Sequence, residues 1–146
     1  MSLIYYYYLI HIPITLLIDS TVLIPPVFEF QKAIVSFHID FNNDFLLKVP
    51  PLWFKIFIFF ELIFQLPYFF VYCFHLKDKP SRYIGDIIYG LNASLTTFVC
   101  LIYALNEKNY PLMGVYGPYC LIPLLIMING IKNLNHIISP VESDKK

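Results

Sequence analysis

The stretch that decides the fold is WFKIFIFFELIFQLPYFFVYCFHL, residues 53–76, which is almost wholly apolar and contains one acid, Glu61. A helix needs about 20 apolar residues to cross the hydrocarbon core of a bilayer, and this stretch is long enough to do so. Further stretches of the same character occur at residues 3–24, 84–105 and 111–131. The sequence therefore predicts an all-α integral membrane protein, a bundle of four transmembrane helices.

The composition supports a membrane protein and excludes other classes. Apolar residues make up 58% of the chain and charged residues only 14%, whereas a soluble domain has about 25% charged residues. Lys and Arg number 10, as do Asp and Glu, so no basic surface predicts binding of nucleic acid. The 3 cysteines lie in apolar stretches without metal-ligand spacing, and we expect no metal and no cofactor. The chain, residues 1–146, is predicted to form a single domain with a tail from residue 132.

The distribution of Lys and Arg predicts the orientation, because basic residues favour cytosolic loops. One side of the predicted bundle carries Lys77, Lys79, Arg82, Lys132, Lys145 and Lys146. The other side carries Lys32, Lys48, Lys55 and Lys108. This mild excess predicts that both termini are cytosolic. We also expect the first span to be retained and not cleaved as a signal peptide, since no Lys or Arg precedes it.

The segment between the first two spans, residues 25–52, is not a polar linker. Proline pairs bound it at residues 25–26 and 50–51, and proline resists helix continuation. Between them, polar residues are interleaved with the apolar residues Val27, Phe28, Phe30, Ile34, Val35, Phe37 and Ile39. We expect this segment to fold back over the lumenal mouth of the bundle.

Each predicted span carries polar side chains on one helix face. An ionisable side chain at bilayer depth costs about 2.5 to 3.5 kcal/mol on insertion scales, so each one suggests a function. The polar residues recur at helical spacing, with His11, Thr15 and Asp19 on the first span, Glu61 and Gln65 on the second, Asp86, Tyr89, Asn92 and Thr96 on the third, and Tyr116 and Tyr119 on the fourth. Convergence of these faces predicts an internal ligand cavity.

Asp19 and Glu61 are the most informative of these polar residues. A buried carboxyl group is either protonated or ionised beside a cation, and no Lys or Arg lies deep enough in the spans to serve both acids. We therefore expect the two acids to share a proton or to bind a cationic or hydroxyl-bearing ligand among aromatic rings. Simpler interpretations stay open, with Asp19 as a solvated acid at a helix end, Asp86 as a partner of Arg82 and His11 as a packing residue.

Three blocks of the sequence resemble the EXPERA family of membrane proteins, to which the emopamil-binding sterol isomerase belongs. They are HIPITLLID at residues 11–19, PPLWFKIFIFFELIFQLP at residues 50–67 and VYGPYCLIP at residues 115–123. They are similar to the sigma-2 receptor branch of this family more than to its isomerase branch. The resemblance implies a four-helix bundle with cytosolic termini in the endoplasmic reticulum membrane, with the nuclear envelope and lysosomal membranes as further locations.

The resemblance also implies a function and a ligand site. It implies a receptor for sterols and cationic amphiphiles within the membrane lipid, a role in cholesterol homeostasis and trafficking, a homodimer, and a cholesterol transporter of the Niemann–Pick C type as a partner. The family's amine-binding acid corresponds to Asp19 and its second essential acid to Glu61. With His11 from the polar face of the first span, the predicted ligand-binding residues are His11, Asp19, Asp44, Glu61, Gln65, Thr96, Tyr116 and Tyr119.

Two other functions stay open. The first is a sterol Δ8–Δ7 isomerase, which needs an acid, a base and a group that stabilises positive charge. Asp19, Glu61 and the aromatic walls could supply them. The second is a chaperone or trafficking partner in which the pocket is incidental.

Overall fold

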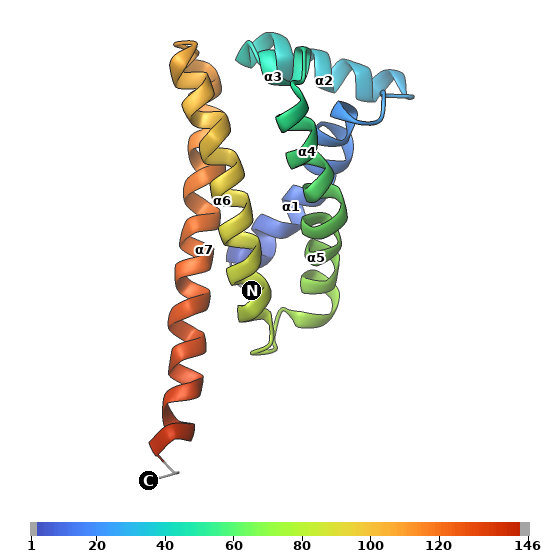
Figure 1. Ribbon diagram of the computed structural model, residues 1–146. Coiled ribbons are helices and arrows are strands. Elements are labelled where there is room, and N and C mark those ends of the chain that lie inside the picture. The colour runs from blue at the N-terminus through green and yellow to red at the C-terminus, as the bar shows by residue number, and fades with distance from the viewer. Residues whose placement is uncertain (1–2, 144–146) are drawn as a thin grey trace.

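The protein folds as a bundle of helices in a computed structural model that describes residues 3–143 (Figure 1). Asp144, Lys145 and Lys146, two of which enter the charge count above, lie outside the described residues. Four helical segments are long and apolar enough to cross a membrane, namely Leu3–Val22, Leu52–Leu76, Arg82–Asn106 and Tyr110–Ser139. The predicted all-α bundle with four spans is thereby confirmed.

The first span consists of α1 (Leu3–Leu17) and a tighter turn of 3-10 helix, η1 (Asp19–Val22). Backbone groups in lipid must find partners within the protein, and hydroxyl side chains supply some of them here. Ser20 Oγ donates to the carbonyl of Leu16 at 2.7 Å, and Thr21 Oγ1 donates to the carbonyl of Ile18 at 2.6 Å. Asp19 therefore lies at the start of a turn that packs against the second span.

The second span contains α4 (Leu52–Phe60), the π-helical turn η2 (Glu61–Gln65), α5 (Leu66–Val71) and a second π-helical turn η3 (Tyr72–Leu76). Pro67 has no N–H, so a regular α-helix would lose a hydrogen bond at this point. In η2 the N–H of Leu66 instead bonds the carbonyl of Glu61, five residues earlier. Such wide turns occur frequently at functional sites, and this one begins at Glu61.

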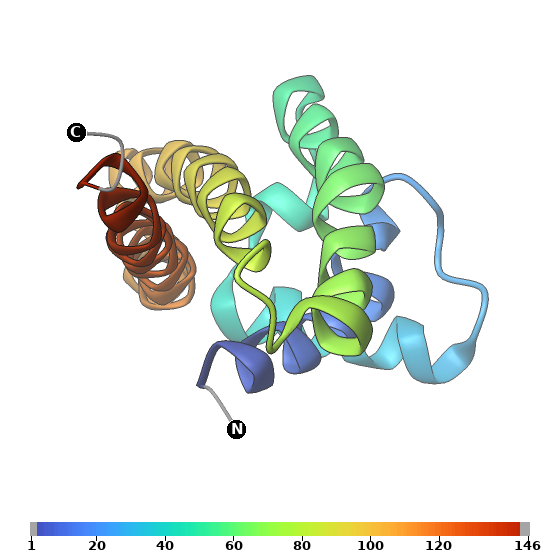
Figure 2. The same ribbon diagram turned by 90° about the horizontal axis from the view of Figure 1, so that it is seen from below.

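The third and fourth spans, in α6 (Arg82–Asn106) and α7 (Tyr110–Ser143), form an antiparallel pair beside the other helices (Figure 2). Gly90 of α6 faces the backbone of α7, since a Cβ atom there would overlap the carbonyl oxygen of Pro123. The helix α7 continues beyond residue 131, where we expected the span to end. The apolar run stops at Lys132, but no glycine or proline interrupts the helix between residues 131 and 139.

The segment between the first two spans contains two helices, α2 (Glu29–Asn42) and α3 (Phe45–Lys48). They lie across one end of the bundle, and α2 packs against α1, α3 and α7 (Figure 1). The side chain of Asn109, just before α7, donates to the carbonyl of Asn43 at 2.7 Å. This bond connects the turn between α2 and α3 to the fourth span.

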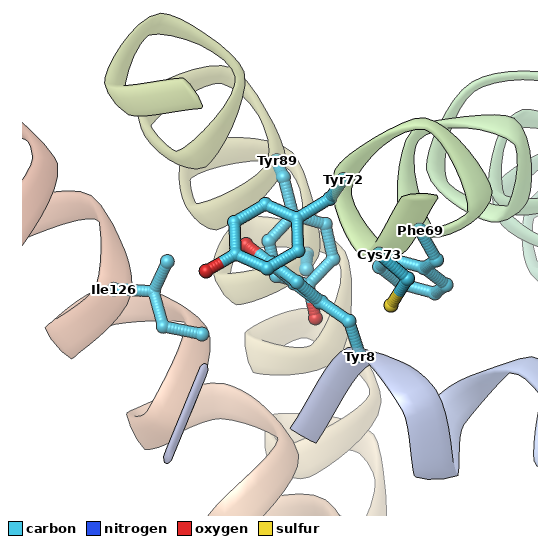
Figure 3. Close-up of a cluster of buried hydrophobic side chains, with 7 residues drawn as sticks. Tyr8, Phe69, Tyr72, Cys73, Tyr89 and Ile126 are labelled. Atoms are coloured by element: carbon cyan, nitrogen blue, oxygen red, sulfur yellow. The ribbon is translucent and has the colours of Figure 1, made fainter. Parts of the chain in front are cut away.

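The core at the opposite end of the bundle is aromatic (Figure 3). Tyr8 is fully buried, with its ring stacked on Phe69 at 5.1 Å and edge-on to Tyr72 at 4.6 Å and to Tyr89 at 5.1 Å. These rings come from α1, α5, η3 and α6. They join the first three spans in a single packed cluster.

Asp86 lies beside this aromatic core and binds hydroxyl groups. Its Oδ1 accepts hydrogen bonds from the hydroxyls of Tyr8 at 2.9 Å and Tyr68 at 2.8 Å. Arg82, which was one expected partner, instead donates to the Tyr72 hydroxyl at 2.8 Å. Asp86 therefore connects three spans, and it is not among the residues that line the cavity described below.

Candidate functional site

A cavity of about 290 Å³ lies between the four spans and the α2–α3 segment. Its wall includes all the residues that the sequence analysis predicted to bind a ligand: His11, Asp19, Asp44, Glu61, Gln65, Thr96, Tyr116 and Tyr119. The structure thus brings together residues that are up to about a hundred positions apart in the sequence. Their role in binding stays a prediction.

Asp19 and Glu61 meet in this cavity. Their carboxyl groups are hydrogen-bond partners, and Thr15 Oγ1 donates to Glu61 Oε1 at 2.7 Å. Both side chains are partly exposed, and both border the cavity. A hydrogen bond between two carboxyl groups requires a proton on one of them, because carboxylates only accept. With a single proton between them, the two groups carry one negative charge.

No basic side chain neutralises this charge within residues 3–143. The ion pairs of this part of the chain are Lys32 with Glu29, and His38 with Asp44 when the histidine is protonated. A charge held away from bulk water without a partner is costly. The acid pair is therefore suited to a cationic group or a hydroxyl group that enters the cavity.

Asp44 is fully buried, and most of its capacity to accept hydrogen bonds is used within the protein. Its Oδ1 accepts from the backbone N–H groups of Leu46 and Leu47, both at 3.0 Å, which caps α3. Its Oδ2 lies 3.3 Å from Nε2 of His38. Asp44 thus borders the cavity while it also holds α3 in place.

Polar aromatic residues form the other part of the wall. The hydroxyls of Tyr7 and Tyr89 are 2.9 Å apart, and the ring of His11 is edge-on to that of Tyr119 at 5.0 Å. The Nδ1 atom of His11 lies 3.0 Å from the carbonyl of Tyr7. Because a carbonyl only accepts, Nδ1 of His11 is the donor in this contact.

Gln65 connects the cavity to the third span. Its Nε2 donates to Oδ1 of Asn92 at 3.4 Å. Asn92 itself is not among the lining residues, although Tyr89 and Thr96 of the same helix face are. The polar face that we predicted on this span is therefore divided, because Asp86 binds the tyrosines and Asn92 supports Gln65.

Tyr7 and His38 are among the cavity residues that were not predicted from the sequence. Tyr7 lies in the run of tyrosines at residues 5–8, which is typical of a membrane interface and gives no hint of a cavity. His38 lies on α2, on the same face as the buried residues Val35 and Asn42. The spacing of three and four positions between Val35, His38 and Asn42 places them on one helix face, and this spacing could have identified the buried face of α2.

An apolar groove lies next to the cavity, between α1 and α7. Its volume is about 360 Å³, and Ile10, Pro118 and Ile122 are among the residues that line it. Five residues line both the groove and the cavity, namely Tyr7, His11, Ile14, Val115 and Tyr119. These side chains lie between the two.

The described residues offer no evident metal site. Within residues 3–143, no three His, Cys, Asp or Glu side chains come together in a way that could hold a metal ion. Cys73, Cys100 and Cys120 are buried free thiols.

Four apolar spans around an acidic and aromatic cavity define the class of this molecule as a multi-pass membrane protein with an internal pocket. Residues 30–130 match the family described as EXPERA, the EXPanded EBP superfamily. This chain belongs to the EXPERA family, and the resemblance seen in its sequence is confirmed.

Relatives with two different names are similar to most of the chain. The human sigma intracellular receptor 2 is 34% identical over 145 residues, which cover 84% of this chain and 81% of the relative. Efficient mitochondria targeting-associated protein 19 of Saccharomyces cerevisiae is 34% identical over 144 residues, which cover 82% of this chain and 89% of the relative. The protein of that name in Schizosaccharomyces pombe is 30% identical over 138 residues, covering 88% of this chain and 73% of the relative.

Proposed function

We propose that this protein is an intracellular membrane receptor that binds a sterol or a cationic amphiphile in the cavity between its spans. The observation that carries the proposal is the contact between the carboxyl groups of Asp19 and Glu61 on the cavity wall. The amine or hydroxyl of the ligand contacts Asp19, and Glu61 supports Asp19 through their shared hydrogen bond. A charge-assisted contact of this kind is stronger away from bulk water.

The aromatic walls suit the rest of such a ligand. Phe54, Phe57, Tyr116 and Tyr119 border the cavity, and ring faces attract an ammonium group as well as apolar rings. A volume of about 290 Å³ is at the lower end of the range for ligand sites, roughly 300 to 1,000 Å³. A small amphiphilic amine fits within it, while the ring system of a sterol extends into the groove between α1 and α7.

The same groove supplies a route from the membrane. It lies among the lipid-facing residues of α1 and α7, and Ile10 and Leu121 on these helices are strongly exposed. A ligand dissolved in the bilayer enters the groove and displaces the side chains of Tyr7, His11 and Tyr119. It then reaches the acid pair without crossing water.

A variant that fills the cavity tests this proposal. Thr97 lines the cavity, whereas the next residue, Phe98, is exposed on the outside of α6. In lipid nanodiscs, we expect saturable binding of a tritiated arylalkylamine that cholesterol displaces. The Thr97→Trp variant should lose at least about tenfold in affinity, about 1.4 kcal/mol, because the indole occupies the ligand volume. The Phe98→Trp control should bind as the parent protein does. Absence of saturable amine binding by the parent protein would refute the proposal.

A sterol isomerase is the second candidate function, since the cavity holds two interacting carboxyl groups among aromatic rings. Such an enzyme adds a proton to a ring double bond, passes through a carbocation and removes a neighbouring proton, so that no proton is gained or lost overall. We expect no conversion when the purified protein is incubated with a Δ8-sterol and the products are separated by chromatography. Conversion to the Δ7-sterol that disappears in Glu61→Gln would favour the enzyme over the receptor.

Several other expectations stay predictions. They are the role in cholesterol homeostasis and trafficking, the endoplasmic reticulum membrane with cytosolic termini, the homodimer and the cholesterol transporter of the Niemann–Pick C type as a partner. The names of the relatives attach different roles to members of this family. For this reason the proposal depends on the cavity and not on those names.

A further inference from the structure

The helix α2 has three distinct faces. One face, with Val35 and Asn42, is buried against the protein, and its His38 borders the cavity. A second face is polar and exposed, and carries Lys32, Ser36 and Asp40. The third face is apolar and exposed, with Phe30 at 56%, Ile34 at 37%, Phe37 at 69% and Phe41 at 72%. These four residues, spaced four, three and four positions apart, are called the phenylalanine face below.

The position of α2 places it at the surface of the membrane. The first span ends at Val22 and the second begins at Leu52, so the segment between them starts and ends where the chain leaves the membrane. Figure 1 shows α2 lying across the end of the bundle and not along it. A helix in this position has one side toward lipid and another toward water.

Exposed apolar residues also flank the α2 segment on both sides. Ile24, two residues beyond the first span, is 61% exposed, and Leu52 is 74% exposed at the start of the second span. The rings of Phe37 and Phe41 are stacked at 5.5 Å, which makes a flat apolar ridge. The polar face beside it holds the exposed ion pair of Lys32 with Glu29 at 2.7 Å. Adjacent apolar and charged faces are typical of a helix that lies in the membrane interface.

We propose that α2 is an interfacial helix whose phenylalanine face inserts into the lipid leaflet at its own end of the bundle. The partner is the boundary between lipid headgroups and acyl chains, where rings are removed from water and the polar face stays hydrated. Because His38 on the same helix borders the cavity, insertion also holds this end of the cavity closed. The inference depends on the four spans and not on the proposed ligand.

Fluorescence quenching tests this inference, because Trp53 is the only tryptophan of the chain. In a Trp53→Phe background, a single tryptophan is placed on the apolar face with Phe37→Trp or on the polar face with Ser36→Trp. The variants are reconstituted in phosphatidylcholine vesicles that contain lipids brominated near the headgroup end of the acyl chains. We expect quenching of the Phe37→Trp fluorescence by at least about half. The Ser36→Trp fluorescence should change little and should be quenched by iodide in the water.

Two results would overturn the inference. One is equal quenching of both variants by the brominated lipid, which would mean that α2 has no preferred face in the membrane. The other is an unquenched Phe37→Trp variant together with efficient disulfide cross-linking between copies that carry Phe41→Cys, which would assign the phenylalanine face to a second copy of the chain. Neither result depends on amine binding, so failure of this inference is distinguishable from failure of the proposed function.

Discussion

Replacement of Asp19 by asparagine is expected to weaken binding of a tritiated arylalkylamine about 100-fold or more. Asparagine keeps the size of the side chain and can still contact Glu61, but it cannot supply a carboxylate to the cation. Breaking a buried ion pair costs about 3 to 5 kcal/mol, and about 2.7 kcal/mol is already a factor of 100 in the dissociation constant. Saturation binding in nanodiscs measures the change.

The matched control for this variant is Asp40→Asn, which removes an acid from the exposed face of α2. It should leave the affinity unchanged, and both variants should show the same helical content by circular dichroism. Glu61→Gln should weaken binding by a smaller factor, about tenfold, because Glu61 acts through its hydrogen bond to Asp19. Tight amine binding by a folded Asp19→Asn variant would remove Asp19 from the site.

The second large effect concerns the contact between α6 and α7. We expect Gly90→Ala to lower the free energy of unfolding by about 3 kcal/mol, the upper part of the usual range for overpacking. The new Cβ atom would overlap the carbonyl oxygen of Pro123 and lie 2.9 Å from the backbone nitrogen of Met127. Since these atoms belong to backbone, the helices must move apart. That cost exceeds the gain of about 1 kcal/mol that alanine brings to a helix.

Gly117→Ala is the control, because it makes the same change on α7 where, apart from the adjoining residues and backbone of α7 itself, nothing lies within 4 Å of the added Cβ atom. It should be neutral or slightly stabilising. Unfolding in increasing concentrations of sodium dodecyl sulfate, followed by circular dichroism, compares the two variants. Equal stability of both would show that α6 and α7 do not approach as closely as the structure has them.

The spans and the two acids were predictable from the sequence for simple reasons. Membrane thickness requires a long apolar helix, so residues 53–76 could be identified by length and composition alone. Charged residues inside such helices are rare, so Glu61 stands out within its own span. The ends of the spans were harder to predict, because α7 continues past the last apolar residues to Ser143.

Partners of polar residues could not be predicted in the same way. Asp86 is four residues from Arg82, which made an ion pair plausible, yet its hydrogen bonds come from Tyr8 and Tyr68. Those two tyrosines lie on other spans, and no spacing pattern in the sequence indicates that they contact Asp86. His38 was missed for a related reason, since its helix reaches the cavity only by lying across the end of the bundle.

By itself, the sequence determined that this chain is a bundle of four membrane helices with acids inside it, because hydrophobic length and the cost of buried charge are properties of each segment alone. Only the tertiary structure decided that Asp19 contacts Glu61. It also decided that Asp86 binds tyrosine hydroxyls and lies apart from these two acids. It further decided that α2 brings His38 to the wall of the cavity. These features depend on how helices rotate and approach one another, and close packing between helices, as at Gly90 of α6 against Pro123 and Met127 of α7, sets that arrangement.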